Sequence, residues 1–261
     1  MTQIESKLVV QRQFQITRNF REFRKMFARI PEGRYRRYGE IWLLDSGIPV
    51  PSWNGIILDA AAFNQIGLYK GEIKEFFTEG TSPLSCWLCP GTDETVIEQS
   101  ELLNEFSHPA KFTAMATDLD KKPLKAETPV NLRIELVKDY AQVEITQKII
   151  RTSFGLPFYC RDALHQVFSR NLYNNNGQLL LYNAYWDGIP AGSAALFLTD
   201  EIAGLYFIST LPDWRGRGIG SSLTLHCLQE ARRLEKRVAV LYASPLGKNI
   251  YLKMGFQEFG F

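Results

Sequence analysis

The sequence predicts an α+β fold, with a mixed, mostly antiparallel sheet flanked by helices, in two such units in tandem. Apolar residues are 45% of the 261 residues, enough for packed cores. In the C-terminal half, strand-like alternation and helix-like spacing follow one another. Residues 118–129 are polar, contain two prolines and have neither period, which is typical of a linker. We therefore expect an N-terminal domain at 1–117, this linker, and a C-terminal domain at 130–261.

Composition narrows the class of protein. The formal net charge of +2 gives no reason to expect nucleic acid or a membrane surface as a partner. Four cysteines are too few for a disulfide framework of the small secreted kind. The first residues lack the basic and apolar regions of a signal peptide, and no apolar run approaches the roughly 18 residues of a spanning helix. We expect a cytoplasmic globular protein.

The C-terminal domain can be divided into elements from its periodicity. Alternation from Val130 to Val137 predicts a strand, and Asp187-Gly188 is a strong hairpin signal between two further strands. Apolar residues at helical spacing over 219–234 predict an amphipathic helix that packs on a sheet. The other expected elements are helices at 140–152 and 160–171, strands at about 178–186, 191–198, 203–210 and 238–242, a short helix through Tyr251, and a final strand from Phe256.

The N-terminal half has fewer clear patterns. Helical spacing joins Phe20, Phe23, Phe27 and Ile30, and basic residues lie between them: Arg18, Arg21, Arg24 and Lys25. We interpret these as a solvated helix face in preference to a patch for an acidic partner. A helix near 69–79, a strand at 84–88, a helix at 95–106 and a strand at 111–117 are also expected. Their order matches that of 219–261 at an offset of about 150 residues, so an ancient duplication is an open hypothesis.

A glycine-rich loop follows the strand predicted at 203–210. The run is Arg215-Gly216-Arg217-Gly218-Ile219-Gly220, and a helix is predicted directly after it. Glycines allow a sharp turn, and the unpaired N–H groups of a helix's first turn attract an anion such as phosphate. A dinucleotide fingerprint would need glycine where Ser221 stands, and a Walker A loop would need a lysine after the glycines. The loop is thus a candidate phosphate site, or a turn that only packs strand against helix.

Two motifs in this half are similar to those of a known family. Arg215-x-x-Gly218-x-Gly220 after a strand resembles the acetyl-CoA loop of the Gcn5-related N-acetyltransferases. The resemblance includes residues 208–214 upstream and Tyr251-Leu-Lys-Met-Gly255-Phe256 downstream, and it covers about residues 130–261. It implies an acyl-CoA N-acyltransferase-like fold, acetyl-CoA as co-substrate, no metal, and an unidentified amine acceptor. The half ahead of it looks like the degenerate first copy in two-domain members.

The resemblance also implies roles for individual residues. Strand backbone would pair with pantetheine and loop amides would hold the pyrophosphate, at Ile208, Ser209, Thr210, Arg215, Gly216, Arg217, Gly218, Ile219, Gly220 and Ser221. Tyr251 would donate a proton to the departing thiolate, since a phenol with a pKa near 10 is a plausible donor to a sulfur whose pKa is about 8.5. The alternative is a tyrosine that only packs at a helix end.

The sequence departs from the family pattern at two points. Many members have a glutamate on or beside the third strand, but residues 203–210 contain no carboxylate. Glu201 and Asp213 flank that strand, and each is either a base acting through water or an ordinary surface acid. We assign no base. Ser244 stands where many members have an asparagine that contacts the cofactor.

The acceptor would lie near the loop at 154–159, by analogy with the family. Its sequence, Phe-Gly-Leu-Pro-Phe-Tyr, suits an apolar or aromatic acceptor, or else forms part of the core. Cys86 and Cys89 have the spacing of a redox or half-zinc motif, but a second pair of ligands at the usual spacing is missing, with His108 alone at a short distance downstream. We interpret them as two buried cysteines. His226 falls on the predicted helix at 219–234, and we see no nucleophile–base pair.

The leading hypothesis is an N-acetyltransferase that transfers acetyl from acetyl-CoA directly to an amine of a small molecule or a protein. The competing hypothesis is a non-catalytic acyl-CoA-binding or regulatory protein that retains the fold. A third is transfer of another acyl group from the same carrier.

Overall fold

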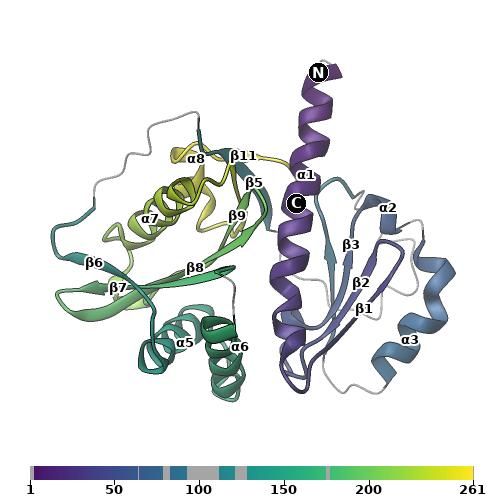
Figure 1. The fold of residues 1–261 in the computed structure, drawn as a ribbon, viewed down its shortest axis with the longest axis horizontal. Coiled ribbons are helices and arrows are strands. Elements are labelled where there is room, and N and C mark those ends of the chain that lie inside the picture. The colour runs from purple at the N-terminus through teal and green to yellow at the C-terminus, as the bar shows by residue number, and fades with distance from the viewer. Residues whose placement is uncertain are drawn as a thin grey trace. The chain divides into compact units, whose positions relative to one another are not determined.

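A computed structural model describes residues 3–63, 65–78, 83–92, 112–120, 128–174 and 177–260. The chain divides into two compact units, drawn in Figure 1. One unit comprises residues 1–114 with 259–261, and the other comprises 115–258. The helix expected at 95–106, His108 and most of the expected linker lie outside the described residues. None of the helices in the described ranges has the length and apolarity that crossing a membrane requires.

The second unit is built on a seven-stranded sheet. The strand order is β11-β5-β10-β9-β8-β7-β6, and all the pairings from β6 to β9 are antiparallel, whereas β9 and β10 are parallel. The mixed, mostly antiparallel sheet expected from the sequence is therefore confirmed. Its strands are β5 (Thr113–Asp118), β6 (Leu132–Leu136), β7 (Leu179–Trp186), β8 (Ile189–Thr199), β9 (Ile202–Thr210), β10 (Val238–Ala243) and β11 (Gln257–Glu258).

The hairpin between β7 and β8 forms at the predicted dipeptide. Asp187 has φ 47° and Gly188 has φ 80°, so both turn residues are left-handed, as a two-residue hairpin with the sheet's twist requires. Trp186 and Ile189 pair directly across the turn. The turn sets the register of β7 against β8.

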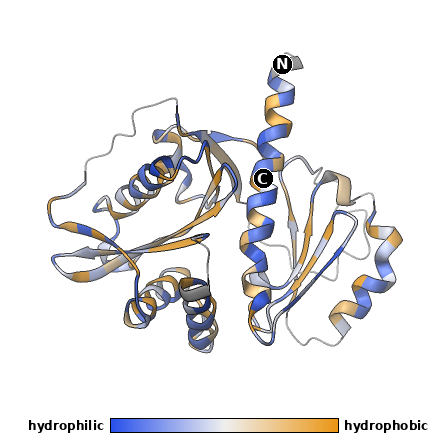
Figure 2. Cartoon of the chain, viewed as in Figure 1, coloured by the Kyte–Doolittle hydropathy of each residue, from blue (hydrophilic) through white to orange (hydrophobic). Residues whose placement is uncertain are grey.

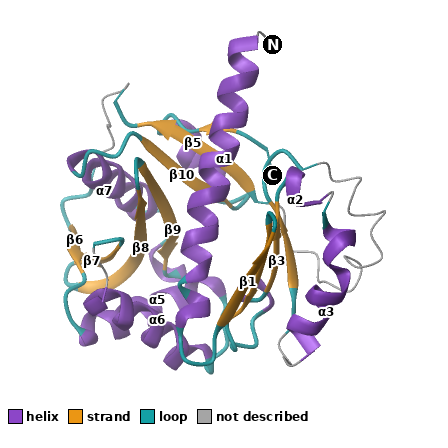
Figure 3. Ribbon diagram, turned by 45° about the vertical axis from the view of Figure 1, so that its right-hand side comes forward, coloured by secondary structure: helices purple, strands orange, loops and turns teal. Residues whose placement is uncertain are grey.

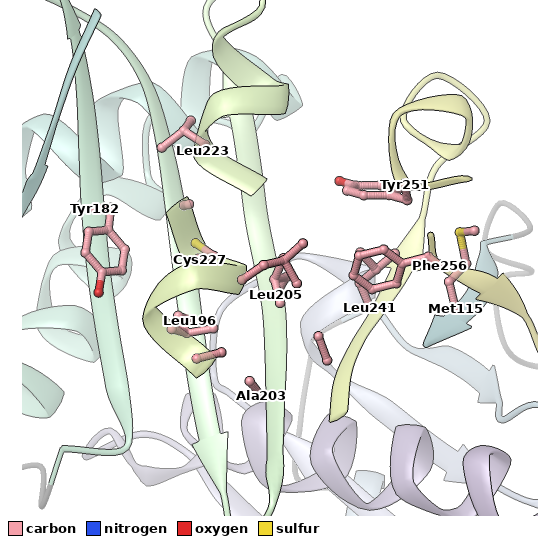
Figure 4. Packing of buried hydrophobic residues seen from close by; sticks show 14 of the residues in the cluster. Met115, Tyr182, Leu196, Ala203, Leu205, Leu223, Cys227, Leu241, Tyr251 and Phe256 are labelled. Atoms are coloured by element: carbon pink, nitrogen blue, oxygen red, sulfur yellow. The ribbon is translucent and has the colours of Figure 1, made fainter. Parts of the chain in front are cut away.

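Helices cover both faces of this sheet (Figure 1). Asp139 caps the first of them by accepting a hydrogen bond from the Gln142 N–H at 2.8 Å, and Gly155 ends it with φ 64°. Apolar residues at helical spacing pack the helix at 219–233 onto the strands, around Leu223, Cys227, Leu205 and Leu241 (Figure 4). The helices are α5 (Tyr140–Phe154), α6 (Cys160–Asn174), α7 (Ile219–Arg233) and α8 (Lys248–Lys253).

The first unit has a four-stranded sheet in the order β1-β2-β3-β4. Three strands that the sequence did not predict precede the expected one. β2 and β3 are short, fully buried apolar runs, and such runs lack the alternation that marks a half-buried strand (Figure 2). The elements are α1 (Gln3–Lys25), β1 (Arg34–Tyr38), β2 (Ile41–Asp45), β3 (Gly55–Leu58), α2 (Ala60–Phe63), α3 (Lys70–Thr78) and β4 (Ser85–Leu88).

The interpretation of the basic residues of α1 as a solvated face was wrong for two of them. Arg21 and Arg24 are each only 6% exposed. Arg21 pairs with Asp59 at 3.0 Å, and the Arg24 guanidinium lies 5.5 Å from the centre of the Trp87 ring. Burial is tolerated because carboxylate and aromatic partners replace the lost hydration. The apolar positions Phe20, Phe23, Phe27 and Ile30 are buried as expected.

The cysteine pair is buried, as the sequence analysis expected. Cys86 lies on β4 and Cys89 just after it, and both are free thiols. Burial raises the pKa of the Cys86 thiol to about 12, with a smaller contribution from Cys89. A thiol that stays protonated at neutral pH is a poor nucleophile and a poor metal ligand.

The two units share one pattern of strands. β1, β2 and β3 are antiparallel neighbours and β3 pairs with β4 in parallel. β7, β8, β9 and β10 repeat this sequence of pairings in the same chain order. In each unit a helix separates the two parallel strands, α3 in the first and α7 in the second, as Figure 3 shows by secondary structure. The described residues therefore form two α+β units in tandem.

Candidate functional site

The two parallel strands of the second unit pair along part of their length. The register joins Val238–Val240 to Ile202–Gly204 and ends there, although β9 continues to Thr210 and β10 to Ala243. Parallel strands that stop pairing leave backbone N–H and C=O groups available to an extended ligand. The predicted contact residues Ile208, Ser209 and Thr210 form the end of β9 beyond this point.

A β-bulge interrupts β9 in the same segment. Ser193 of β8 pairs with Ser209 and Ala195 pairs with Tyr206, so two residues of β9 stand opposite one of β8. The first of the two, Phe207, has φ 50°, which is rare for a bulky side chain. Bulges of this kind re-aim backbone groups beside functional sites. No sequence signal marked this one, because Phe207 continues the apolar strand pattern.

The glycine loop joins β9 to α7 and contains two glycines in the left-handed backbone conformation. Gly216 has φ 79° and Gly218 has φ 80°, and Gly218 is the N-cap residue of α7. The first α7 hydrogen bond runs from the Ser222 N–H to the Gly218 carbonyl at 2.9 Å. The N–H groups of Ile219, Gly220 and Ser221 belong to the first turn, where an α-helix offers no internal acceptor. The loop thus has the form of an anion site, with the positive end of a 15-residue helix behind it.

The two arginines of the loop are held differently. The Arg217 guanidinium lies 4.8 Å from the centre of the Trp214 ring and 5.7 Å from that of Trp186. Arg215 is exposed and donates long hydrogen bonds of 3.4 Å to the carbonyls of Thr210 and Ser153. Aromatic stacking restricts the Arg217 side chain, so its charge stays beside the loop.

Three elements meet at Gly220. A β-carbon at this position would lie 3.7 Å from Thr210 Oγ1 on β9 and 3.8 Å from Ile250 Cδ1 on α8. Gly192 on β8 allows an even closer approach, since a β-carbon there would lie 2.8 Å from Ile219 Cγ2 and 2.8 Å from the Ser209 carbonyl oxygen. The end of β9, the start of α7 and the helix that carries Tyr251 are therefore neighbours.

Tyr251 is 9% exposed and packs in the core cluster of the unit. Its ring centre lies 5.8 Å from that of Phe256, and Figure 4 shows its hydroxyl directed toward the strand that carries Leu205. Burial raises the pKa of the Tyr251 phenol to about 12. The phenol is therefore protonated at neutral pH. Ser244 accepts a hydrogen bond from the Gly247 N–H at 3.3 Å on its Oγ, which places it at the start of α8.

The two acids that flank β9 lie at the surface. Glu201 pairs with Arg237 at 3.4 Å, and its side chain is 59% exposed. Asp213 is exposed in the short 3₁₀ turn at Pro212–Trp214. His226 lies on α7 with its ring centre 4.6 Å from that of Tyr182, and burial lowers the pKa of its imidazole.

The loop between α5 and α6 presents aromatic side chains to solvent. Phe154 is 53% exposed, Phe158 66% and Tyr159 56%, so these rings are not core residues. The Phe154 ring centre lies 6.0 Å from that of Phe207 at the bulge, and Phe168 of α6 lies at the same distance on another side. Phe154 at the start of the aromatic loop therefore contacts the bulge of β9.

Arg151 on the last turn of α5 is a further residue of this surface that the sequence analysis did not single out. Its guanidinium lies 4.9 Å from the centre of the Phe158 ring. An arginine in an amphipathic helix is ordinary in sequence, and only the fold places it beside the exposed rings.

Residues 176–258 match the family model described as "Acetyltransferase (GNAT) domain". No curated protein matches the sequence. Residues 176–258 of the second unit are therefore similar to a GNAT acetyltransferase domain, as the resemblance indicated.

Solved structures extend the fold similarity to the first unit. A GCN5-related N-acetyltransferase from Kribbella flavida is similar over 94% of this chain and 92% of its own, with a TM-score of 0.66 and 15% identity. One from Sphaerobacter thermophilus is similar over 84% and 77%, with a TM-score of 0.57 and 13% identity. A functionally unknown conserved protein from Staphylococcus epidermidis is similar over 81% and 83%, with a TM-score of 0.55 and 18% identity. At these identities the likeness concerns the fold.

Proposed function

We propose that the protein is an N-acetyltransferase that transfers acetyl from acetyl-CoA directly to an amine. The observation that carries the proposal is the meeting of three features in one unit: the end of the β9–β10 pairing, the glycine loop at the start of α7, and the buried phenol of Tyr251. Gly220 lies beside Thr210 at the end of β9 and beside Ile250, the residue before Tyr251 on α8. The match of residues 176–258 to an acetyltransferase family model supports it.

The donor set of the loop fits a pyrophosphate. The first-turn N–H groups at Ile219, Gly220 and Ser221 are donors without helical acceptors, and the helix dipole adds positive potential. A side chain at Gly216 would meet no atom within 4 Å, so the backbone there is open to a ligand. Arg215 and Arg217 add charge beside the loop. We assign the end of β9, at Ile208, Ser209 and Thr210, to the pantetheine arm.

The chemistry needs a polarised carbonyl and a proton for the leaving sulfur. Acetyl-CoA supplies the activated thioester carbonyl. We assign its polarisation to the backbone N–H of Ile208, because a bulge removes one N–H from the strand ladder. As the amine nitrogen bonds to the acyl carbon and the carbon–sulfur bond breaks, the Tyr251 hydroxyl gives its proton to sulfur. The nitrogen loses its extra proton to solvent, and solvent returns a proton to the Tyr251 oxygen. Its raised pKa means that this hydroxyl holds a proton at neutral pH.

The test follows free thiol release from acetyl-CoA in the presence of a panel of amines, with calorimetric titration of CoA in parallel. We expect CoA to bind and at least one amine to release thiol. Tight CoA binding without release on any amine would favour the acyl-CoA-binding hypothesis. Faster release from propionyl-CoA than from acetyl-CoA would identify a different acyl donor.

We also propose that the first unit is a degenerate copy of the second. The repeated order of pairings, β1 to β4 and β7 to β10, supports a duplication. In the first unit, the segment between the two parallel strands contains Lys70–Thr78 in place of a loop with the Arg-x-x-Gly-x-Gly pattern.

A further inference from the structure

We propose that the acceptor is an aromatic amine that also carries a carboxylate, and that Arg151 binds this carboxylate. The inference rests on the proposed function and adds the chemical class of its acceptor. Its basis is the set of Arg151, Phe154, Phe158 and Tyr159, which we call the aromatic rim and which contacts the bulge of β9 through Phe154.

The aromatic rim has the composition of a binding surface. Phe154, Phe158 and Tyr159 lie within six residues of chain and are each more than half exposed. Keeping several large rings in water is unfavourable, and clustered exposed apolar residues mark sites where a ligand or partner docks. Flat rings offer stacking and edge contacts that favour another aromatic ring.

Contacts of the rim place it beside the proposed reaction centre. The Phe154 and Phe207 rings are 6.0 Å apart, and Phe207 is part of the bulge to which we assign carbonyl polarisation. Arg151 precedes Phe154 by three residues on α5, so the two side chains emerge on the same side of the helix, one turn apart. An acceptor ring on Phe154 and Phe158 would thus lie between the bulge and Arg151.

The positive charge of Arg151 favours an anionic ligand. Its Nε atom is buried and makes no hydrogen bond, and the guanidinium forms no ion pair, within the described part of the chain. Arg161 also lies over the Phe158 ring, at 5.3 Å, but its charge is matched by Asp162 at 2.9 Å. A partly buried guanidinium gains most from a carboxylate, which it can bind with two parallel hydrogen bonds.

The combination favours one acceptor class over others. A ring fits the exposed aromatic side chains, a carboxylate fits Arg151, and the amine must reach the bulge. Free aromatic amino acids carry all three groups. Cationic acceptors such as polyamines or lysine side chains would bring positive charge beside the guanidinium of Arg151, which is unfavourable.

The test compares matched acceptors in the thiol-release assay on the full chain. Phenylalanine has ring and carboxylate, phenylethylamine lacks the carboxylate, and leucine lacks the ring. Because hydrogen bonds to charged groups are worth about 1.5–3 kcal/mol, we expect kcat/KM for phenylalanine to exceed that for phenylethylamine by about 10- to 100-fold. Leucine should be the poorer amino acid. Equal values for phenylalanine and phenylethylamine, or acetylation of polyamines alone, would overturn the inference and leave the proposed function intact.

Variants assign the preference to Arg151. Arg151→Gln should bring the phenylalanine to phenylethylamine ratio close to 1, and Arg151→Lys should restore part of it. Arg161→Gln is the matched control, because this arginine stacks on the same ring but is already paired, and it should keep the wild-type ratio. A ratio that Arg151→Gln leaves unchanged, with an unaltered melting temperature, would contradict the assignment.

A binding measurement separates this inference from the proposed function. Calorimetric titration of N-acetylphenylalanine into the protein with CoA present does not depend on turnover. Binding that weakens about tenfold or more in Arg151→Gln supports the ligand class even if no amine is acetylated, a result that would remove only the proposed function. Absence of binding in the wild-type protein, alongside acetylation of other amines, would remove only the ligand class.

Discussion

At the scale of single residues, a substitution of Tyr251 gives the most direct test of the proposed chemistry. General acid catalysis by a positioned side chain typically contributes about 10²–10⁴ in rate. Tyr251→Phe should therefore lower kcat about a hundredfold or more, while the dissociation constant of acetyl-CoA stays within about twofold, because no cofactor contact is assigned to the hydroxyl. Steady-state kinetics and calorimetry measure the two quantities.

A control tests whether any change of tyrosine to phenylalanine in the second unit would have this effect. Tyr140 at the start of α5 is 54% exposed and has no assigned role. Tyr140→Phe should keep both kcat and CoA affinity. An unchanged kcat in Tyr251→Phe would return Tyr251 to the alternative of a packed helix-end tyrosine.

The same residue predicts a change in alkaline stability. Burial raises the pKa of folded Tyr251 to about 12, whereas in the unfolded chain it is near 10. The unfolded state therefore loses the phenol proton first. The contribution of the buried, protonated phenol to the free energy of unfolding is complete below pH 10 and is lost as the pH rises from 10 to 12. By pH 11 the free energy of unfolding has fallen by about 1 kcal/mol from this cause. The free energy of unfolding in urea should therefore fall less steeply above pH 10 in Tyr251→Phe than in the wild type. Parallel curves would show that burial does not shift this phenol.

Residue patterns could be predicted where a local rule decides the structure. The Asp187-Gly188 turn and the position of Tyr251 on a short helix follow from sequence, because left-handed turns and helical spacing are local properties. The bulge at Phe207 and the pairing of Arg21 with Asp59 depend on residues that only the fold brings together. Buried arginines have the same sequence signature as solvated ones.

At the scale of elements, the glycine loop and the first turn of α7 carry the proposed cofactor contacts. Gly220→Ala places a methyl group between Thr210 and Ile250 at contacts of 3.7 and 3.8 Å, without backbone strain. We expect the melting temperature to stay the same or rise slightly, since alanine favours helix by about 1 kcal/mol over glycine. Acetyl-CoA affinity should fall about tenfold or more, because the methyl occupies the approach to the first-turn N–H groups. Thermal melting and CoA titration measure the two effects.

Gly218→Ala provides the contrast. With φ 80° at this position, a β-carbon costs about 1–2 kcal/mol of strain, so both stability and affinity should fall. Gly220→Ala with unchanged CoA affinity would argue that the loop only packs strand against helix.

Elements of the second unit were predicted well, whereas β1, β2 and β3 of the first unit were not predicted. The helix expected near 69–79 and the strand expected at 84–88 match α3 and β4 of the first unit. α7 spans Ile219–Arg233 against an expected 219–234, because amphipathic spacing over four turns is a strong signal. β2 and β3 are five and four residues long and buried throughout, so they show no period at all. Their strand character comes from the neighbours with which they pair.

At the scale of the whole molecule, the boundary between the two units lies just before Met115, whereas the polar stretch that we expected to be the linker spans residues 118–129. β5 lies N-terminal to residues 118–129, yet it sits between β11 and β10 in the sheet of the second unit. Met115 and Leu119 are 0% and 1% exposed and belong to the core of that sheet. The second unit therefore needs a strand from before the polar stretch.

This arrangement predicts how fragments behave. A fragment of residues 130–261 loses β5 and two buried side chains, each of which contributes about 2–5 kcal/mol by analogy with large-to-small core changes. We expect it to melt without cooperativity, whereas residues 112–261 should melt cooperatively. Circular dichroism during heating distinguishes the two. Equal cooperative transitions would mean that β5 is dispensable.

The place of β5 also bears on the order in which the chain can fold. Met115 pairs with Glu258, 258 − 115 = 143 positions later in the chain. Closing so long a loop costs entropy before any contact offsets it, so this pairing should form late. During synthesis, β5 leaves the ribosome long before its neighbours β10 and β11 are made. Met115 therefore has no core to pack against until those strands follow. The middle of the chain and its end thus complete one sheet together, in the last step of folding.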